Sequence, residues 1–171
     1  MKVQSFDDLF FTALEYMYDA EKQLAEALPK MAQASTTPQL KEVFEKHHKE
    51  THEHVKRVEQ IFGAFGKKPS SQHNTVVESM VNEANGMIRN IDVGSIRDAA
   101  LVHAANQVEH WEIAAYTSLL NDAKRFGRKD AISLIDQTLT EEREAAAKVT
   151  EISEKYVNPQ AAQVHAHAGV R

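Results

Sequence analysis

The chain has 171 residues, enough for one domain with a sizeable buried core, and it contains no cysteine, which excludes disulfides, thiolate metal sites and a cysteine nucleophile. Its 20 basic and 25 acidic residues give a net charge of −5, which argues against nucleic acid or an anionic membrane surface as the main partner. Hydrophobic residues make up 42% of the chain without a run long enough to span a bilayer, so we expect a globular cytoplasmic protein.

Apolar residues recur at steps of three and four along nearly the whole chain, which is the pattern of amphipathic helices. Ser5 is predicted as the N-cap of the first helix, and Pro29 is predicted to kink its last turns. Ser95 is predicted as the N-cap of the third long helix, and Gly127 as the residue that ends it. The predicted helices cover residues 6–34, 39–65, 75–90, 96–126 and 129–156.

The connections between these helices predict the topology. Short links after residues 34 and 126 make each pair of long helices an antiparallel hairpin, and the longer stretch between the hairpins, with its own short helix, can run the length of a bundle. The sequence therefore predicts an all-α four-helix bundle with a long crossover that contains a shorter fifth helix. We expect residues 1–158 to form this bundle and residues 159–171 to form a frayed, flexible tail.

Glutamate stands on the inward-facing line of every long helix, where packing favours leucine. An ionised carboxylate in apolar surroundings normally takes up a proton or finds a cationic partner. No lysine or arginine lies on these lines, so the pattern predicts a bound cation. The glutamates are Glu21, Glu50, Glu109, Glu112 and Glu142.

The positions of these glutamates along the helices support a shared site. Glu21 and Glu50 lie at nearly equal distances along the chain from the turn at Thr36, and Glu112 and Glu142 lie at equal distances from Gly127. Carboxylates from four helices at one level are suited to hard cations, and two metal ions bridged by shared glutamates would neutralise most of the charge.

Two segments carry a resemblance to a known family: Tyr-Asp-Ala-Glu-Lys-Gln at residues 18–23 and Val-Glu-His-Trp-Glu at residues 108–112. Over roughly residues 5–156 the chain resembles the YciE/YciF bacterial stress-protein family of the ferritin-like superfamily. The resemblance implies a ferritin-like bundle that dimerises and carries a di-iron centre. It implies as metal ligands Glu21, Glu50, Glu109, Glu112 and Glu142.

The chain departs from the ferritin-like pattern in its histidines. Such sites often supply Glu-x-x-His from two helices, but here Glu53 stands three residues after Glu50 and Ala145 three after Glu142. The candidate replacements are His47 and His54, one turn to either side of Glu50, and His110, and Glu53 is a weaker candidate ligand.

The resulting hypothesis is a stress-response protein with a carboxylate-bridged dinuclear centre, holding iron or alternatively manganese. An activity of oxidase or peroxidase type would react ferrous iron with oxygen or peroxide. Glu50 and Glu112 are expected to bridge the ions, Glu21 and Glu142 to be terminal or bridging, and Glu109 to be an additional ligand. The alternative is a metal-poor structural or interaction protein that acts as a homodimeric bundle.

Overall fold

The computed structural model describes residues 3–168, which form helices and connecting turns without a β-strand. The all-α class predicted from the sequence is confirmed. Between the last two α-helices the chain makes one π-helical turn, η1. The elements are α1 Phe6–Ala34, α2 Pro38–Ala64, α3 Thr75–Asn90, α4 Ser95–Phe126, α5 Lys129–Ile152, η1 Ser153–Val157 and α6 Asn158–Ala168.

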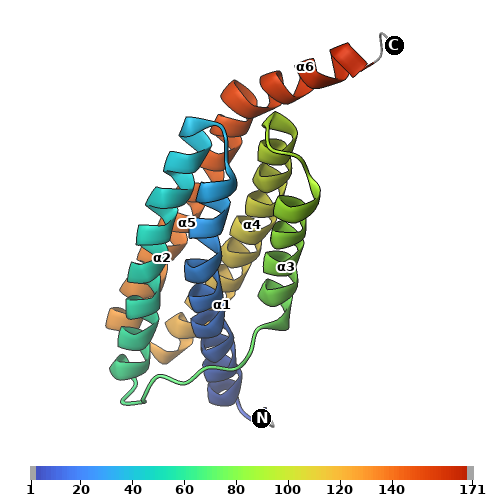
Figure 1. Cartoon of the computed structure of the whole chain (residues 1–171). Helices are drawn as coiled ribbons and strands as arrows, with labels where there is room; N and C mark the ends of the chain where they lie inside the picture. The colour runs from blue at the N-terminus through green and yellow to red at the C-terminus, as the bar shows by residue number, and fades with distance from the viewer. Residues whose placement is uncertain (1–2, 169–171) are drawn as a thin grey trace.

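The four long helices α1, α2, α4 and α5 run side by side, while α3 lies in the crossover beside α1 and α4 (Figure 1). The turns from α1 to α2 and from α4 to α5 are short, so each pair is an antiparallel hairpin. The predicted bundle with a long crossover and a shorter fifth helix is confirmed. Within residues 3–168, no helix has the length and hydrophobicity that a membrane span requires.

Two of the three predicted helix-end residues are confirmed. Ser5 caps α1 through a reciprocal capping box with Asp8, and Gly127 ends α4 with a left-handed φ of 65°. Helix α1 continues through Pro29 to Ala34. The prediction that Ser95 caps α4 is wrong, because Ser95 is the first helical residue and Gly94, at φ 145°, is the cap. That φ is open to glycine and disfavoured for other residues.

The region after Pro159 differs from the predicted frayed tail, because the chain continues as α6 to Ala168. Pro159 stands in the first turn of α6, where a backbone N–H is not needed for the helical ladder. The π-helical turn before it lets the helix change direction without ending. As a result, α6 leans away from the end of the bundle (Figure 1).

The apolar core of the bundle falls into two large clusters, one toward each end. One contains Leu28 and Leu40 near the α1–α2 turn, and the other contains Phe10, Leu14 and Ile61 toward the opposite end. Buried polar side chains of all four long helices lie between them in the middle of the bundle. Rigid apolar packing on both sides therefore holds the polar layer in place.

Asp98 in the first turn of α4 ties the α1–α2 turn to the rest of the bundle. Its buried carboxylate accepts hydrogen bonds from the Thr36 backbone N–H and hydroxyl at 2.9 and 2.7 Å, and from the Thr37 N–H at 2.7 Å. We expect Asp98→Ala to lower the free energy of unfolding by about 2 kcal/mol, because buried donors lose a charged acceptor. Urea unfolding measures this, with Asp92→Ala as the exposed control, and a loss no larger than the control's would contradict it.

Candidate metal centre

Helix α2 turns a stripe of polar side chains toward the other long helices. His47, Thr51 and His54 are buried on this stripe at steps of four and three residues, and the Thr51 hydroxyl donates to the His47 carbonyl at 2.9 Å. Residues at these steps share a helix face, so both imidazoles point into the middle of the bundle. Of the three candidate nitrogen ligands, His47 and His54 are therefore placed in the interior, whereas His110 is exposed.

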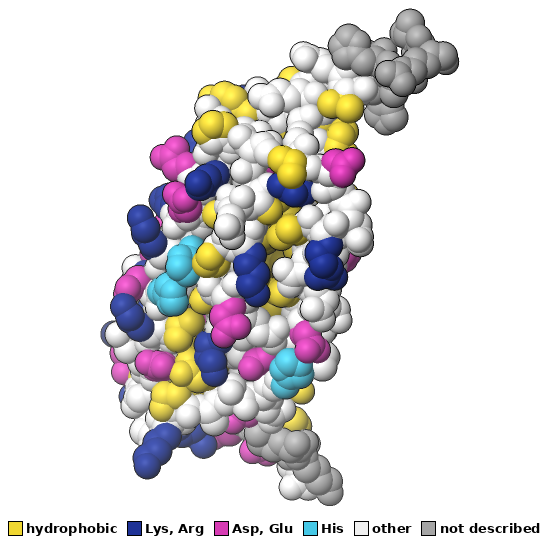
Figure 2. Space-filling view, viewed as in Figure 1, with side chains coloured by type: hydrophobic (Ala, Val, Ile, Leu, Met, Phe, Trp, Pro, Cys, Tyr) yellow, Lys and Arg dark blue, Asp and Glu magenta, His cyan; other side chains and the backbone are white. Residues whose placement is uncertain are grey.

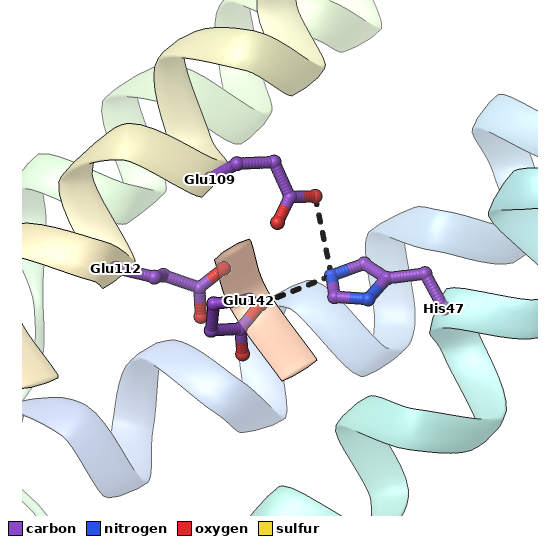
Figure 3. A group of neighbouring side chains, drawn as sticks. All are labelled: His47, Glu109, Glu112 and Glu142. Carbon is purple, nitrogen blue, oxygen red and sulfur yellow. Dashed lines mark ion pairs between the residues drawn. The ribbon is translucent and has the colours of Figure 1, made fainter. Parts of the chain in front are cut away.

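His47 and three buried glutamates form one cluster of four side chains (Figure 3). The His47 Nε2 atom lies 3.2 Å from Glu109 Oε1 and 3.7 Å from Glu142 Oε2. Glu112, one turn after Glu109 on α4, completes the group, and one nitrogen or oxygen from each residue lies within 4.8 Å of the others. Helices α2, α4 and α5 thus bring three carboxylates and an imidazole to one point.

A second cluster lies next to the first and shares Glu142 with it. The His54 Nδ1 atom lies 2.8 Å from Glu142 Oε1 and 3.5 Å from Glu21 Oε2. All three side chains are fully buried. Because Glu142 directs one oxygen to each histidine, it is the residue at the centre of the arrangement.

Several atoms of the two clusters have no hydrogen-bond partner among the described residues. Both oxygens of Glu112 and of Glu142 are in this state, as is one oxygen each of Glu21 and Glu109. Burial raises the pKa of Glu112 well above its ordinary value, and burial together with the Glu142 charge raises the pKa of Glu109 to about 8. Without metal, the two clusters therefore hold protons that a bound cation would displace.

The carboxylates act on the two histidines in the opposite direction. Burial alone would lower the pKa of His47, but Glu109, Glu50 and Glu142 together outweigh it and raise the pKa to about 9. The Glu21 and Glu142 carboxylates likewise raise the pKa of His54 to about 11 against the effect of burial. The metal-free site is therefore neutralised by protons on its imidazoles and on its raised-pKa carboxyl groups, and a cation would bind by displacing these protons.

Side chains outside the two clusters hold their members in position. The Tyr116 hydroxyl, one turn after Glu112, donates a hydrogen bond to Glu21. His54 Nε2 lies 2.9 Å from Glu141, whose carboxylate also accepts two hydrogen bonds from Arg57 at 2.6 and 2.9 Å. Such outer contacts fix the ring orientation of a ligating histidine.

Two of the candidate glutamates lie outside the clusters. Glu50 lies at the edge of the first cluster: its side chain is 25% exposed, one oxygen pairs with Lys46 Nζ at 2.6 Å, and the other lies 3.7 Å from His47 Nδ1. Glu53 is exposed and pairs with Lys56 at 2.6 Å. The structure thus brings together Glu21, Glu109, Glu112 and Glu142 but not Glu50 or Glu53.

The donor set fits a metal ion. Carboxylate oxygens and imidazole nitrogens suit iron, manganese and zinc, and the unpartnered buried oxygens leave lone pairs directed at the interior. The two clusters, joined at Glu142, are compatible with one ion in each. These buried groups could therefore hold metal.

A small apolar cavity lies between α1, α3 and α4 beside the first cluster. His47 and Glu109 form its polar end, and the rest of its wall is aliphatic. Helices α1, α3 and α4 supply this wall. Its side chains include Leu24, Leu28, Val81, Ala84, Ala105 and Val108.

Fold and site together define a helical bundle whose interior carries a cluster of carboxylates and histidines able to hold metal. The chain belongs to the family described as a domain of unknown function, DUF892, whose model matches residues 5–162. This agrees with the resemblance found in the sequence, because one relative is the protein YciF of Escherichia coli strain K12. It is 35% identical over 162 residues, which cover 94% of this chain and 98% of the relative.

Solved structures give the same result. The crystal structure of the E. coli stress protein YciF matches with a TM-score of 0.87 over 91% of this chain and 99% of that one, at 35% identity. YcfI of Rhodopseudomonas palustris matches with a TM-score of 0.84 at 33% identity, over 87% of this chain and 95% of that one. A Xanthomonas campestris protein shares the fold alone, with a TM-score of 0.75 at 21% identity over 95% and 99% of the two chains.

Proposed function

We propose that the protein binds two metal ions, preferably iron, in the middle of its bundle. It uses them to react with oxygen or peroxide under stress. The observation that carries this proposal is the pair of buried clusters that share Glu142, with carboxylate oxygens lacking partners among residues 3–168. The naming of the E. coli relative as a stress protein supports the physiological part.

The clusters suggest a role for each residue. One ion would be held by His47, Glu109 and Glu112 and the other by Glu21 and His54, with Glu142 shared. This assigns the shared position to Glu142 in place of Glu50, whose carboxylate is engaged by Lys46. Bound in the ferrous state, the two ions would supply the electrons that reduce dioxygen or peroxide.

The apolar cavity favours dioxygen over peroxide as the reactant. Its aliphatic wall offers no hydrogen bonds to a polar molecule, and its polar end consists of His47 and Glu109. Moving an apolar diatomic molecule from water into such a cavity costs little free energy, whereas peroxide would give up its hydrogen bonds to water. Tyr116 and the Arg57–Glu141 pair would keep the ligands in place while their charge changes.

Anaerobic titration of the metal-free chain with ferrous iron tests this proposal. We expect about two irons per chain. With free ferrous iron at about 100 times the dissociation constant of each site, the two sites should add about 5 kcal/mol to the free energy of unfolding. For a chain of this length that gain corresponds to a rise of at least about 10 °C in the melting temperature. Calorimetry and metal analysis measure the two quantities.

The Glu53→Gln variant is the matched control, because Glu53 is an exposed glutamate of α2 and should leave both quantities unchanged. Absence of bound metal after loading, together with unchanged melting, would reject the metal centre. That outcome would favour the structural role, which the description of the R. palustris relative as a candidate structural protein also suggests.

A further inference from the structure

A second pair of histidines lies on helix α2, away from the buried clusters. His48 is half-buried and His52 is exposed, and their Nε2 atoms lie 3.0 Å apart across one helical turn. The two rings are 4.6 Å apart between centroids. Histidine side chains are visible at the surface over α2 (Figure 2).

The spacing of the two nitrogens matches a chelate. Imidazole nitrogens bind first-row metals at about 2.0–2.1 Å, so two nitrogens at a right angle around one ion lie about 2.9 Å apart. At a tetrahedral angle they would lie about 3.3 Å apart. The 3.0 Å separation, at which the two rings share a hydrogen bond without metal, is closer to the right-angle arrangement, which tetragonal copper(II) and square-planar nickel(II) prefer.

The surroundings separate this pair from the centre in the bundle interior. His48 lines a shallow hollow between α1 and α2, whose other polar residues are Gln33, Glu45, Lys41 and Lys49. None of the residues of the two buried clusters lines this hollow. The hollow is open to solvent, so water molecules can complete the coordination of an ion held by two imidazoles.

We propose that His48 and His52 form a surface site for a divalent transition metal, with copper(II) preferred over nickel(II) and zinc(II). The preference follows from the nitrogen spacing and from the general order of divalent metal affinities. The site is independent of the proposed function of the buried centre, because it shares no residue with that centre.

Titration of the full chain with copper(II) iminodiacetate tests the site, because the chelated ion is too large to enter the closed interior. Electron paramagnetic resonance is expected to show two imidazole nitrogens on the bound copper. His48→Ala and His52→Ala should each weaken binding by about tenfold or more, since the second nitrogen of a chelate binds intramolecularly. The double variant removes both nitrogens and should lose binding at this site.

Two controls separate this pair from other histidines. His103→Ala removes an exposed α4 histidine with no histidine one turn away, and His165→Ala with His167→Ala removes a close pair of histidines outside α2. Both are expected to retain the site. The proposal fails if the His48 and His52 variants bind copper(II) iminodiacetate as tightly as the unmodified chain does. It also fails if each variant only lowers the number of bound ions at unchanged affinity, because two separate imidazoles would give that result. Alanine favours helix, and circular dichroism confirms folding of each variant.

Discussion

Glu112→Leu is expected to stabilise the metal-free protein and to weaken its metal binding. Glu112 is 1% exposed, and neither carboxylate oxygen has a hydrogen-bond partner within residues 3–168. A buried polar group without a partner costs about 1–3 kcal/mol, and a leucine of similar volume removes that cost. Urea unfolding of the metal-free chain should therefore show a gain of about 1–3 kcal/mol.

With iron bound the order of stabilities should reverse. The variant lacks one oxygen ligand of the His47 cluster, so ferrous iron should raise its melting temperature by much less than that of the unmodified chain. Glu144→Leu, at an exposed position on α5, is the control and should change neither property. A Glu112→Leu variant that is destabilised without metal, or that gains as much from iron as the unmodified chain, would contradict this account.

The fold could be predicted from the sequence because its signals are local. The three-four periodicity locates every long helix, and Ser5 and Gly127 mark helix ends through backbone chemistry that depends on neighbouring residues alone. The end of the chain was harder to predict, because Pro159 can end a helix or begin one. The preceding π-helical turn decides between these outcomes, and it has no clear signal in the sequence.

The buried glutamates were predictable for the same reason, but the ligand positions on α2 were not. Steps of three and of four both keep a helical residue near one face, so Glu50 and Thr51 were equally consistent with the line through His47. The structure buries Thr51 and leaves Glu50 at the edge beside Lys46. That choice depends on how α2 is rotated against α5, which is a property of tertiary packing.

Asp98 and Arg57 show what sequence analysis missed altogether. An acidic residue in the first turn of a helix is explained by the helix dipole alone, so nothing indicated that Asp98 binds the α1–α2 turn. Arg57 reaches across to α5 and contacts Glu141, a pairing between residues far apart in the chain. Contacts of this kind become visible only when the helices are placed next to one another.

Glu142→Gln is expected to have the opposite effect on the metal-free protein from Glu112→Leu. The Glu142 carboxylate lies 2.8 Å from His54 Nδ1. Burial would lower the pKa of His54, but the charges of Glu21 and Glu142 outweigh burial and raise it to about 11. Removing one partner of a buried ion pair leaves the other charge poorly compensated and costs about 3–5 kcal/mol. Urea unfolding should show this loss, and the double variant with His54→Gln should recover part of it because both charges are then gone.

Metal binding distinguishes the shared residue from the others. Because Glu142 belongs to both clusters, Glu142→Gln should weaken the binding of both ions, whereas Glu21→Gln should leave the ion held by His47 and lower the stoichiometry from two to one. The double variant with His54→Gln should stay unable to hold two ions even where its stability recovers. If Glu142→Gln bound two irons with unchanged affinity, the two clusters would not be joined through this residue. A purely structural role for the cluster predicts the loss of stability but no response to iron in any variant, so calorimetry with and without metal separates the two.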